Sequence, residues 1–210
     1  CEKKKYLICT NESFAYATGV QVKDLKTFFT LHIDKTKIEV STSLFGKCNV
    51  DNIIVASALA YLLGVNLLDI KKGIESLKPI PHRLELIKGY AYVLDDSYNS
   101  NFSGFKQALD VLSNFKGKKI LVTPGMVELG REQFELNYQI AKNMAKVCDE
   151  IVVMNKVNRE AILKGLSEEN FNEKRIHLAT SRKEQTEILK KIITKDSVVL
   201  FENDLPDNYK

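Results

Sequence analysis

Residues 82–210 alternate between strand-like and helix-like patterns, and this alternation constrains the fold more than any other feature of the chain. Five apolar runs predict β-strands, at residues 90–94, 119–123, 150–154, 175–178 and 197–201. Between them lie apolar residues with helical spacing, such as Phe105, Ala108 and Leu112. Strands separated by single helices are joined by right-handed crossovers and form a mostly parallel sheet. We therefore predict an α/β fold with a Rossmann-like, doubly wound domain in which helices flank the sheet.

Residues 1–80 follow a different pattern. Three segments rich in β-branched and aromatic residues predict an antiparallel meander, at residues 13–22, 26–33 and 37–43. Helical spacing follows, with a second helix predicted over 68–77, before Pro79 and Pro81. Because proline stops helix propagation, this pair marks a boundary between two predicted domains, 1–80 and 81–210.

Charge and apolar content exclude two classes of protein. The net charge is +4 and the lysines are interspersed with acidic residues, whereas a nucleic-acid interface needs a denser basic stripe. We therefore expect no nucleic-acid partner. The longest apolar run, 53–68, contains Ser57, Gly64 and Asn66 and is shorter than the roughly 20 residues of a membrane span. We therefore expect no membrane insertion.

The four cysteines, Cys1, Cys9, Cys48 and Cys148, have no regular spacing and form no CxxC pair. Such scattered cysteines are typical of reduced, buried thiols in a cytoplasmic protein. The chain also begins at Cys1 without a methionine, in the middle of a pattern, and we expect it to be a fragment of a longer protein.

A run of polar residues, DDSYNSN at 95–101, follows the first predicted strand of the second domain. In open parallel sheets, ligands bind at the carboxyl ends of the strands, so this stretch is a candidate site. A second polar stretch, TPGMVELG at 123–130, follows the next strand along the chain, and both stretches precede helices. The alternative interpretation is that Asp95, Ser97 and Asn101 are turn and N-cap residues, which are frequent where a strand leads into a helix.

Other signals of catalysis are weak. Neither GMVELG nor the stretch 45–48 continues into the Gly-Lys-Ser/Thr of a phosphate-binding P-loop. His32, His82 and His177 are scattered, without the spacing of metal ligands. The sequence also lacks a GxSxG nucleophile elbow, and nucleophilic catalysis is therefore disfavoured.

Four motifs, in this order, resemble the C-terminal half of a Mur ligase: KCNVDN at 47–52, PHRLEL at 81–86, DDSYNSN at 95–101 and GMVELG at 125–130. Mur ligases are ATP-dependent enzymes that build the peptide stem of the bacterial cell wall. The resemblance implies that residues 1–80 are the end of the family's central ATP-binding domain and that 81–210 are its C-terminal domain. Within the family, the heptad is most similar to that of enzymes that join D-Ala-D-Ala to UDP-N-acetylmuramoyl-tripeptide.

The resemblance assigns four residues to ATP. It implies that Asn49 reaches the adenine, since an amide can both donate to and accept from a base edge. Asn52 lies three residues further on, on roughly the same helical face, and is assigned to ATP with Asn49. An equally supported interpretation is that Asn52 only helps to start the helix. Arg83 is implied to contact phosphate or ribose oxygens, where the alternative is a surface ion pair. Asp96 is implied to accept hydrogen bonds from the ribose hydroxyls.

The same resemblance places Ser97, Tyr98, Asn99 and Asn101 in a substrate-binding loop, with Tyr98 stacking and Asn99 steadying the turn. It implies no catalytic residue within this chain, because the family's P-loop, modified lysine and magnesium ligands lie upstream of Cys1. The fragment is therefore expected to be inactive alone.

The implied reaction starts when ATP, with Mg2+, phosphorylates the carboxylate of UDP-N-acetylmuramoyl-tripeptide, after which the amine of D-Ala-D-Ala attacks the acyl phosphate. The protein is expected to be a cytoplasmic monomer that serves peptidoglycan synthesis, and hence cell shape and division. Two alternatives stay open: a Mur-type ligase with a different amine acceptor, and a non-catalytic binding member of the fold. A dinucleotide-dependent oxidoreductase ranks low, because no GxGxxG follows the first strand of the second domain.

Several residues depart from the family pattern. Phe102 stands where the family usually has proline, Gly125 where an aspartate is common, and His82 where a glycine precedes the arginine. The ending ENDLPDNY, at 202–209, does not resemble the tail of the better-known members. These departures bear on the amine acceptor more than on the nucleotide.

Overall fold

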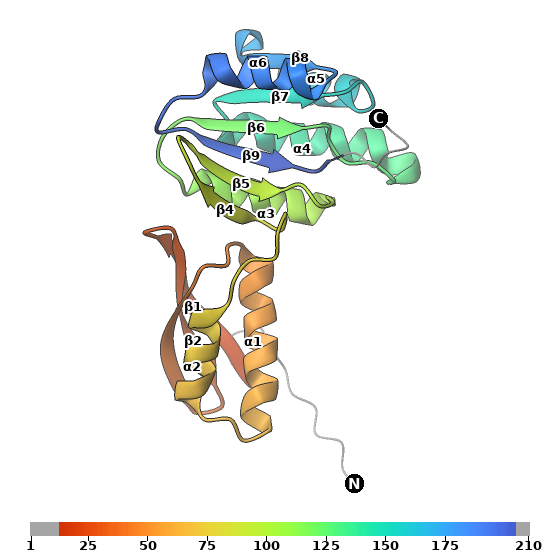
Figure 1. Ribbon diagram of the computed structural model, residues 1–210. Coiled ribbons are helices and arrows are strands. Elements are labelled where there is room, and N and C mark those ends of the chain that lie inside the picture. Colours follow the sequence, from red (N-terminus) through yellow and green to blue (C-terminus); the bar gives the residue numbers. More distant parts are fainter. Residues whose placement is uncertain (1–12, 205–210) are drawn as a thin grey trace. The chain divides into compact units, whose positions relative to one another are not determined.

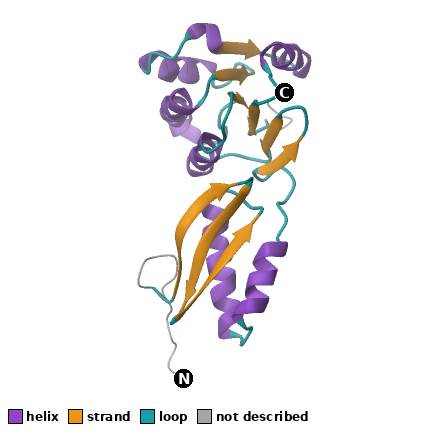
Figure 2. Ribbon diagram, turned by 90° about the vertical axis from the view of Figure 1, so that its left-hand side faces the viewer, coloured by secondary structure: helices purple, strands orange, loops and turns teal. Residues whose placement is uncertain are grey.

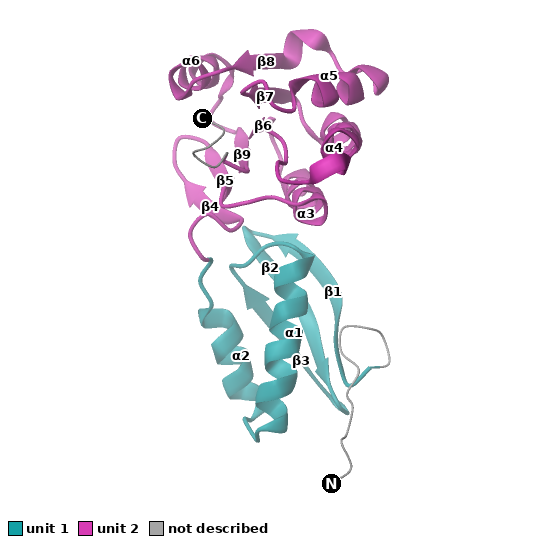
Figure 3. Cartoon of the chain, turned by 90° about the vertical axis from the view of Figure 1, so that its right-hand side faces the viewer, with its two compact units in different colours: residues 1–79 teal, residues 80–210 magenta. Residues whose placement is uncertain are grey.

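A computed structural model of the protein describes residues 13–204. The chain divides into two compact units, Cys1–Pro79 and Ile80–Lys210 (Figure 3). The predicted buried thiols of Cys1 and Cys9 lie outside the described residues.

The first unit is an antiparallel sheet covered on one face by two helices (Figure 2). Its elements are β1 (Ala15–Lys23), β2 (Lys26–Ile33), β3 (Thr36–Thr42), α1 (Lys47–Leu62) and α2 (Leu67–Ser76). Every second residue of β2 is buried, and Phe29, Leu31 and Ile33 share one apolar cluster with Ile54 and Ile70 of the helices. This alternation is typical of an antiparallel strand with one face on the core. The predicted meander followed by two helices is confirmed.

Helix α1 carries apolar side chains on two sides. Ile53 and Ile54 are buried against the sheet, whereas Val55, Leu59 and Leu62 are 49%, 59% and 44% exposed. A helix that is apolar all round is usually buried on all sides. The second apolar side of α1 is therefore uncovered within the described part of the chain.

The second unit is a six-stranded sheet in the order β4-β5-β9-β6-β7-β8 (Figure 1). Strand β4 pairs antiparallel with β5, and all other neighbours are parallel. Helices α3, α4 and α5 cover one face, and α6 covers the other (Figure 3). The elements are β4 (Glu85–Lys88), β5 (Tyr92–Asp96), α3 (Phe102–Ser113), β6 (Lys119–Thr123), α4 (Gln133–Val147), β7 (Glu150–Met154), α5 (Arg159–Glu168), β8 (Ile176–Ala179), α6 (Arg182–Ile192) and β9 (Val198–Glu202), with short 3-10 helices at Gly130–Glu132 and Glu173–Arg175. This mostly parallel, helix-flanked sheet confirms the predicted fold class.

Two features of this sheet go beyond the sequence prediction. The sequence does not predict β4, because its four residues, ELIK, include only two apolar side chains and lie partly exposed at the edge. Strand β9 is the last in the chain but lies between β5 and β6, where Leu200 is fully buried. The carboxyl ends of β5, β9 and β6 therefore form one continuous edge of the sheet.

The two described cysteines differ in exposure. Cys148 is buried as predicted, and burial raises the pKa of its thiol. Cys48 is exposed, so the prediction of a buried thiol is wrong there, because it lies in the first turn of α1 on the side away from the sheet core. Within residues 13–204, no helix combines the length and the apolar character needed to cross a membrane.

Candidate functional site

The two adjacent carboxylates of the polar stretch point to opposite faces of the sheet. In the parallel register of β5 and β9, Asp95 is opposite Phe201 and Asp96 is opposite Glu202. Successive side chains of a strand alternate between faces, so Asp95 and Asp96 belong to two separate environments. Asp95 lines a pocket, and Asp96 interacts with the buried carboxyl of Glu202.

Contacts around Arg83 attach the segment before β4 to the polar loop. Nη1 of Arg83 donates to Oδ1 of Asn99 at 2.8 Å, and the guanidinium carbon lies 4.1 Å from the centre of the Tyr98 ring. The backbone N–H of Tyr98 donates to the carbonyl of His82 at 3.3 Å. Stacking on an aromatic face holds a guanidinium by a cation–π interaction and leaves most of its donors available. PHRLEL and DDSYNSN, separate in sequence, thus form one polar surface.

Asp96 is held through both its side chain and its backbone. Its Oδ1 accepts from the N–H of Leu84 at 3.0 Å, and its carbonyl accepts from the N–H of Asn203 at 3.2 Å. Burial raises the pKa of the Asp96 carboxyl, while the Leu84 N–H and the charge of Arg83 act in the opposite direction. Burial and the neighbouring Asp96 raise the pKa of Glu202 well above its ordinary value. Single ionisation of this pair is favoured over double ionisation, because two carboxylates buried side by side repel each other strongly.

Asp95 forms a separate cluster with His82 and Ser97. The Nδ1 of His82 lies 2.8 Å from Oδ2 of Asp95, and the Ser97 hydroxyl donates to Oδ1 of Asp95 at 2.6 Å. In a hydrolytic triad the histidine lies between the acid and the serine, whereas here the serine bonds directly to the carboxylate. The Ser97 oxygen is 3.5 Å from Nδ1 of His82. These residues order the loop and do not form an activated nucleophile.

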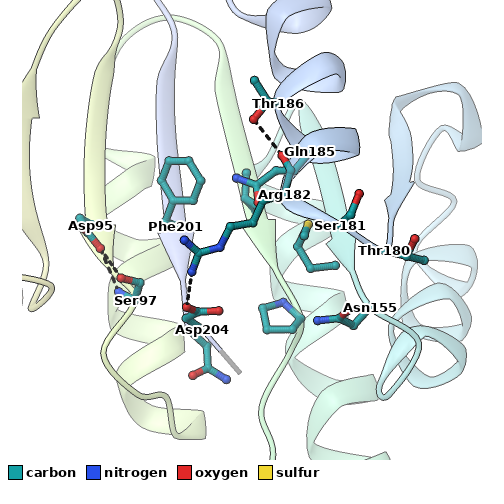
Figure 4. A pocket seen from close by; sticks show the side chains of 14 residues that line it. Asp95, Ser97, Asn155, Thr180, Ser181, Arg182, Gln185, Thr186, Phe201 and Asp204 are labelled. Atoms are coloured by element: carbon teal, nitrogen blue, oxygen red, sulfur yellow. Dashed lines mark hydrogen bonds and ion pairs between the residues drawn. The ribbon is translucent and has the colours of Figure 1, made fainter. Parts of the chain in front are cut away.

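A pocket of about 590 Å³ lies at the carboxyl edge of the sheet, beside the start of α6 (Figure 4). Met154 and Phe201 give its lining an apolar part. The side chain of Arg182, the first residue of α6, reaches across to Asp204, with Nη2 and Oδ2 3.0 Å apart (Figure 4). Asp95 lies at the opposite side of the pocket (Figure 4). Carboxylates and a guanidinium around an apolar lining suit a small ligand that carries both charges.

Three buried asparagines fix the loop that follows β6. Asn137 bonds to both the N–H and the carbonyl of Met126, at 2.8 Å each, and Asn158 donates to the same carbonyl at 2.9 Å. Asn203 donates to the carbonyl of Gly125 at 2.7 Å. A Cβ on residue 125 would lie 2.3 Å from Oδ1 of Asn137, and Gly125 has a φ of 77°. The loop therefore requires glycine at position 125.

The structure places the other predicted residues as follows. Asn49 and Asn52 lie in the first unit and line a groove of about 450 Å³ between α1 and α2. The amide of Asn49 donates to the carbonyl of Phe45 at 2.7 Å, and Asn52 is exposed. Asn101 is the N-cap of α3, since its Oδ1 accepts from the N–H of Gly104 at 2.9 Å. The capping interpretation therefore holds for Asn101.

Sequence reasoning does not single out Asn155, Arg182, Glu202 or Asn203, which all lie at the carboxyl edge. Glu202 and Asn203 end and follow β9, and Asn155 follows β7. A polar residue directly after a buried apolar run is the same signal that DDSYNSN gives, in a shorter form. Among residues 13–204, no group of three His, Cys, Asp or Glu side chains could hold a metal ion.

Comparisons with known proteins identify similar sequences and similar folds. The family model described as "Mur ligase, glutamate ligase domain" matches residues 82–202. The UDP-N-acetylmuramoyl-tripeptide–D-alanyl-D-alanine ligase of Buchnera aphidicola subsp. Acyrthosiphon pisum (strain APS) is 34% identical over 146 residues, which are 69% of this chain and 30% of that protein. A crystal structure of MurF from Acinetobacter baumannii has a TM-score of 0.79 and 25% identity, over 92% of this chain and 42% of that one. MurF from Thermotoga maritima, solved in complex with ADP, has a TM-score of 0.78 and 21% identity, over 94% and 44%. The chain thus spans less than half the length of each of these relatives.

Proposed function

The chain belongs to the Mur ligase family, and we propose that it is part of an ATP-dependent ligase that joins D-Ala-D-Ala to UDP-N-acetylmuramoyl-tripeptide. The family match over residues 82–202 carries the proposal, because that region contains Arg83, the DDSYNSN loop and most of the pocket beside α6. The UDP-N-acetylmuramoyl-tripeptide–D-alanyl-D-alanine ligase of Buchnera supports the choice of acceptor. We further propose that the reaction takes place in a longer protein of which this chain is the C-terminal part.

Residues 1–80 are proposed to belong to an ATP-binding domain, and 81–210 to the family's C-terminal domain. The exposed apolar side of α1, which includes Val55 and Leu59, supports the first assignment, because such a helix needs a second apolar partner. The family match from residue 82 supports the second assignment.

The nucleotide is proposed to contact Asn49, Asn52, Arg83 and Asp96. The Asp96 carboxylate is a suitable acceptor for the two ribose hydroxyls, because it is partly exposed and its other bonds hold it in place. Arg83 presents donors from a guanidinium that is already stacked on Tyr98, so less side-chain entropy is lost when phosphate or ribose oxygens bind. The ADP complex of the Thermotoga relative supports a nucleotide in this family.

The pocket beside α6 is proposed to receive the amine acceptor. D-Ala-D-Ala carries an ammonium group, a carboxylate and two methyl groups. Asp95 and Asp204 can pair with the ammonium, Arg182 with the carboxylate, and Phe201 with a methyl group. Ser97 orders the Asp95 side of the pocket, and Tyr98, Asn99 and Asn101 of the same loop are proposed to contact substrate or hold the loop.

The proposed reaction has two steps. A carboxylate oxygen of the tripeptide attacks the γ-phosphorus of ATP, which gives an acyl phosphate and ADP. The deprotonated amine of D-Ala-D-Ala then attacks the acyl carbon, and inorganic phosphate leaves as the amide forms. The role of this chain is to orient the nucleotide and the acceptor, because reactants that are bound in the correct geometry react faster than reactants that must meet in solution. Magnesium is proposed to accompany ATP, but residues 13–204 contain no suitable cluster of ligands, and no step here depends on it.

Phosphate release from ATP by the full-length ligase tests this function. We expect release to require both UDP-N-acetylmuramoyl-tripeptide and D-Ala-D-Ala. Asp96→Asn should weaken ATP binding about ten- to hundredfold, because hydrogen bonds to a charged acceptor contribute about 1.5–3 kcal/mol. Asp110→Asn is the matched control, since Asp110 is exposed on α3 outside the site.

The other outcomes separate the alternatives. Phosphate release that requires the tripeptide but does not depend on D-Ala-D-Ala would contradict the proposed acceptor and would support a Mur-type ligase with a different amine acceptor. No release with any amine would favour a non-catalytic binding member of the family.

A further inference from the structure

We propose that Glu202 is a positioning residue for the nucleotide site, and that one proton shared between the Glu202 and Asp96 carboxyl groups fixes the Asp96 side chain. This inference rests on the proposed function, because it assigns the purpose of the pair to ribose binding. Glu202 is not among the residues that the sequence motifs assign to ATP.

The geometry brings the two carboxyl groups together on one face of the sheet. Asp96 and Glu202 are direct neighbours in the parallel register of β5 and β9, so their side chains point the same way. Glu202 is 1% exposed, although it is the last residue of an otherwise apolar strand. In a carboxyl that is buried to this extent, an oxygen without a hydrogen-bond partner is energetically costly.

Within residues 13–204, only one oxygen of Glu202 has a conventional donor. The hydroxyl of Ser100 donates to Oε1 at 2.6 Å, across the end of the DDSYNSN loop. The other oxygen, Oε2, is buried without a donor from the rest of the described chain. A proton on one of the two acids resolves this, because a protonated carboxyl donates to an ionised one.

The surroundings place that proton mainly on Glu202. The Leu84 N–H and the charge of Arg83 favour an ionised Asp96, while Asp95 opposes it. For Glu202, burial and the charge of Asp96 both raise the pKa, and Ser100 gives only partial compensation. Among the charged groups of the described residues, Asp96 has the largest effect on the pKa of Glu202. The pair therefore carries one negative charge, located on the partly exposed member.

This arrangement gives Glu202 two functions in the site. Its proton holds Asp96 as an oriented, ionised acceptor for ribose hydroxyls. Its Oε1 holds Ser100, and so fixes the end of the loop that carries Tyr98 and Asn99. A glutamine at 202 would reproduce both bonds without a titrating proton, whereas a leucine would remove both and keep a similar volume.

The first test is the pH dependence of unfolding of this 210-residue chain. The folded-state pKa of Glu202 is raised, so the stability it gives is present below its unfolded pKa and is lost as pH rises through the folded pKa. Over that range the unfolding constant should rise up to about tenfold per pH unit. Glu202→Gln should abolish this part of the slope. Parallel profiles for the two proteins would overturn the shared proton.

Carbon-13 NMR of the side-chain carboxyls gives the same information without a variant. The signals of Glu202 and Asp96 should both report the same two macroscopic steps, and the second step, the loss of the shared proton, should lie above the ordinary range of carboxylic acids. Independent titration of both signals near pH 4 would also overturn the proposal.

The second test is ribose recognition by the full-length ligase, measured as the ratio of dissociation constants for 2′,3′-dideoxy-ATP and ATP. We expect a ratio of about 10–100 in the unsubstituted enzyme, a similar ratio in Glu202→Gln, and a ratio near 1 in Glu202→Leu. If Glu202→Leu weakens the binding of ATP and of 2′,3′-dideoxy-ATP by the same factor, the role of Glu202 is merely structural and the inference is overturned. An unsubstituted enzyme that binds neither nucleotide would overturn the proposed function instead, and the unfolding profile still decides whether the proton is shared.

Discussion

Replacing Gly125 by alanine tests how firmly the loop after β6 is held. The new methyl group would lie 2.3 Å from Oδ1 of Asn137 and 3.0 Å from the Asn158 side chain. Overpacking of this kind costs about 1–3 kcal/mol. Displacing Asn137 breaks its bond to Met126 and leaves buried polar groups unpaired, for about 1–3 kcal/mol more. The left-handed backbone at φ 77° adds about 1–2 kcal/mol for a residue with a Cβ.

Gly130→Ala provides the matched control in the same stretch of sequence. Gly130 also has a positive φ, of 55°, but nothing lies within 4 Å of its added Cβ. We expect Gly130→Ala to lower the free energy of unfolding by about 1–2 kcal/mol, and Gly125→Ala by about 3–8 kcal/mol. Urea unfolding followed by far-UV circular dichroism measures both. Equal losses in the two variants would refute the view that the asparagine network, and not backbone strain alone, requires glycine at 125.

Two further predictions concern Gly165 and Glu150 of the second unit. Gly165→Ala should destabilise the protein by about 2–4 kcal/mol in thermal unfolding, because its Cβ would lie 2.4 Å from the carbonyl oxygen of Tyr138. The control is Gly73→Ala in α2, where the added Cβ meets open space, and it should stabilise the protein by about 0.5–1 kcal/mol. A Gly165→Ala variant as stable as the unsubstituted chain would contradict this close packing of α4 and α5. Burial opposes ionisation of Glu150, but hydrogen bonds from His177 and a lysine outweigh it and lower the pKa. The resulting stability is present above the ordinary pKa of 4.5 and is lost as pH falls through the lowered value, so Glu150→Gln should destabilise by about 1–2 kcal/mol at pH 7 and by progressively less as the carboxyl becomes protonated in acid. A difference in the free energy of unfolding that stays constant from pH 7 down to the acid end of the folded range, measured by denaturant titration, would be inconsistent with that ionisation.

Local pattern predicts most of the elements but not their order in space. The periodicity of residues 26–33 matches β2 because alternate side chains face the core of the first unit. The pattern at 197–201 likewise predicts a strand, yet it contains nothing that places β9 between β5 and β6. That position depends on the return of the chain through α6, which is a property of the whole sheet. The sequence does not indicate a role for Glu202 for this reason, since its partner Asp96 lies on the neighbouring β5.

The candidate site was predictable as a region and not as an arrangement. Two adjacent acids at 95 and 96 indicate a polar strand end, but only the alternation of faces in the folded sheet separates Asp95 from Asp96. His82 has a φ of 63°, a left-handed backbone that glycine adopts easily and other residues rarely do. Its side chain then reaches Asp95, a contact that the sequence does not indicate.

The most direct test of the proposed ligase follows an oxygen atom. UDP-N-acetylmuramoyl-tripeptide labelled with oxygen-18 in its reacting carboxylate is incubated with ATP, D-Ala-D-Ala and the full-length enzyme, and the phosphate is analysed by mass spectrometry. Because the phosphorylated carboxylate oxygen leaves with the phosphate, we predict one labelled oxygen per phosphate, in equal amount to the amide product. Unlabelled phosphate, or labelled phosphate without the D-Ala-D-Ala amide, would contradict the proposed reaction.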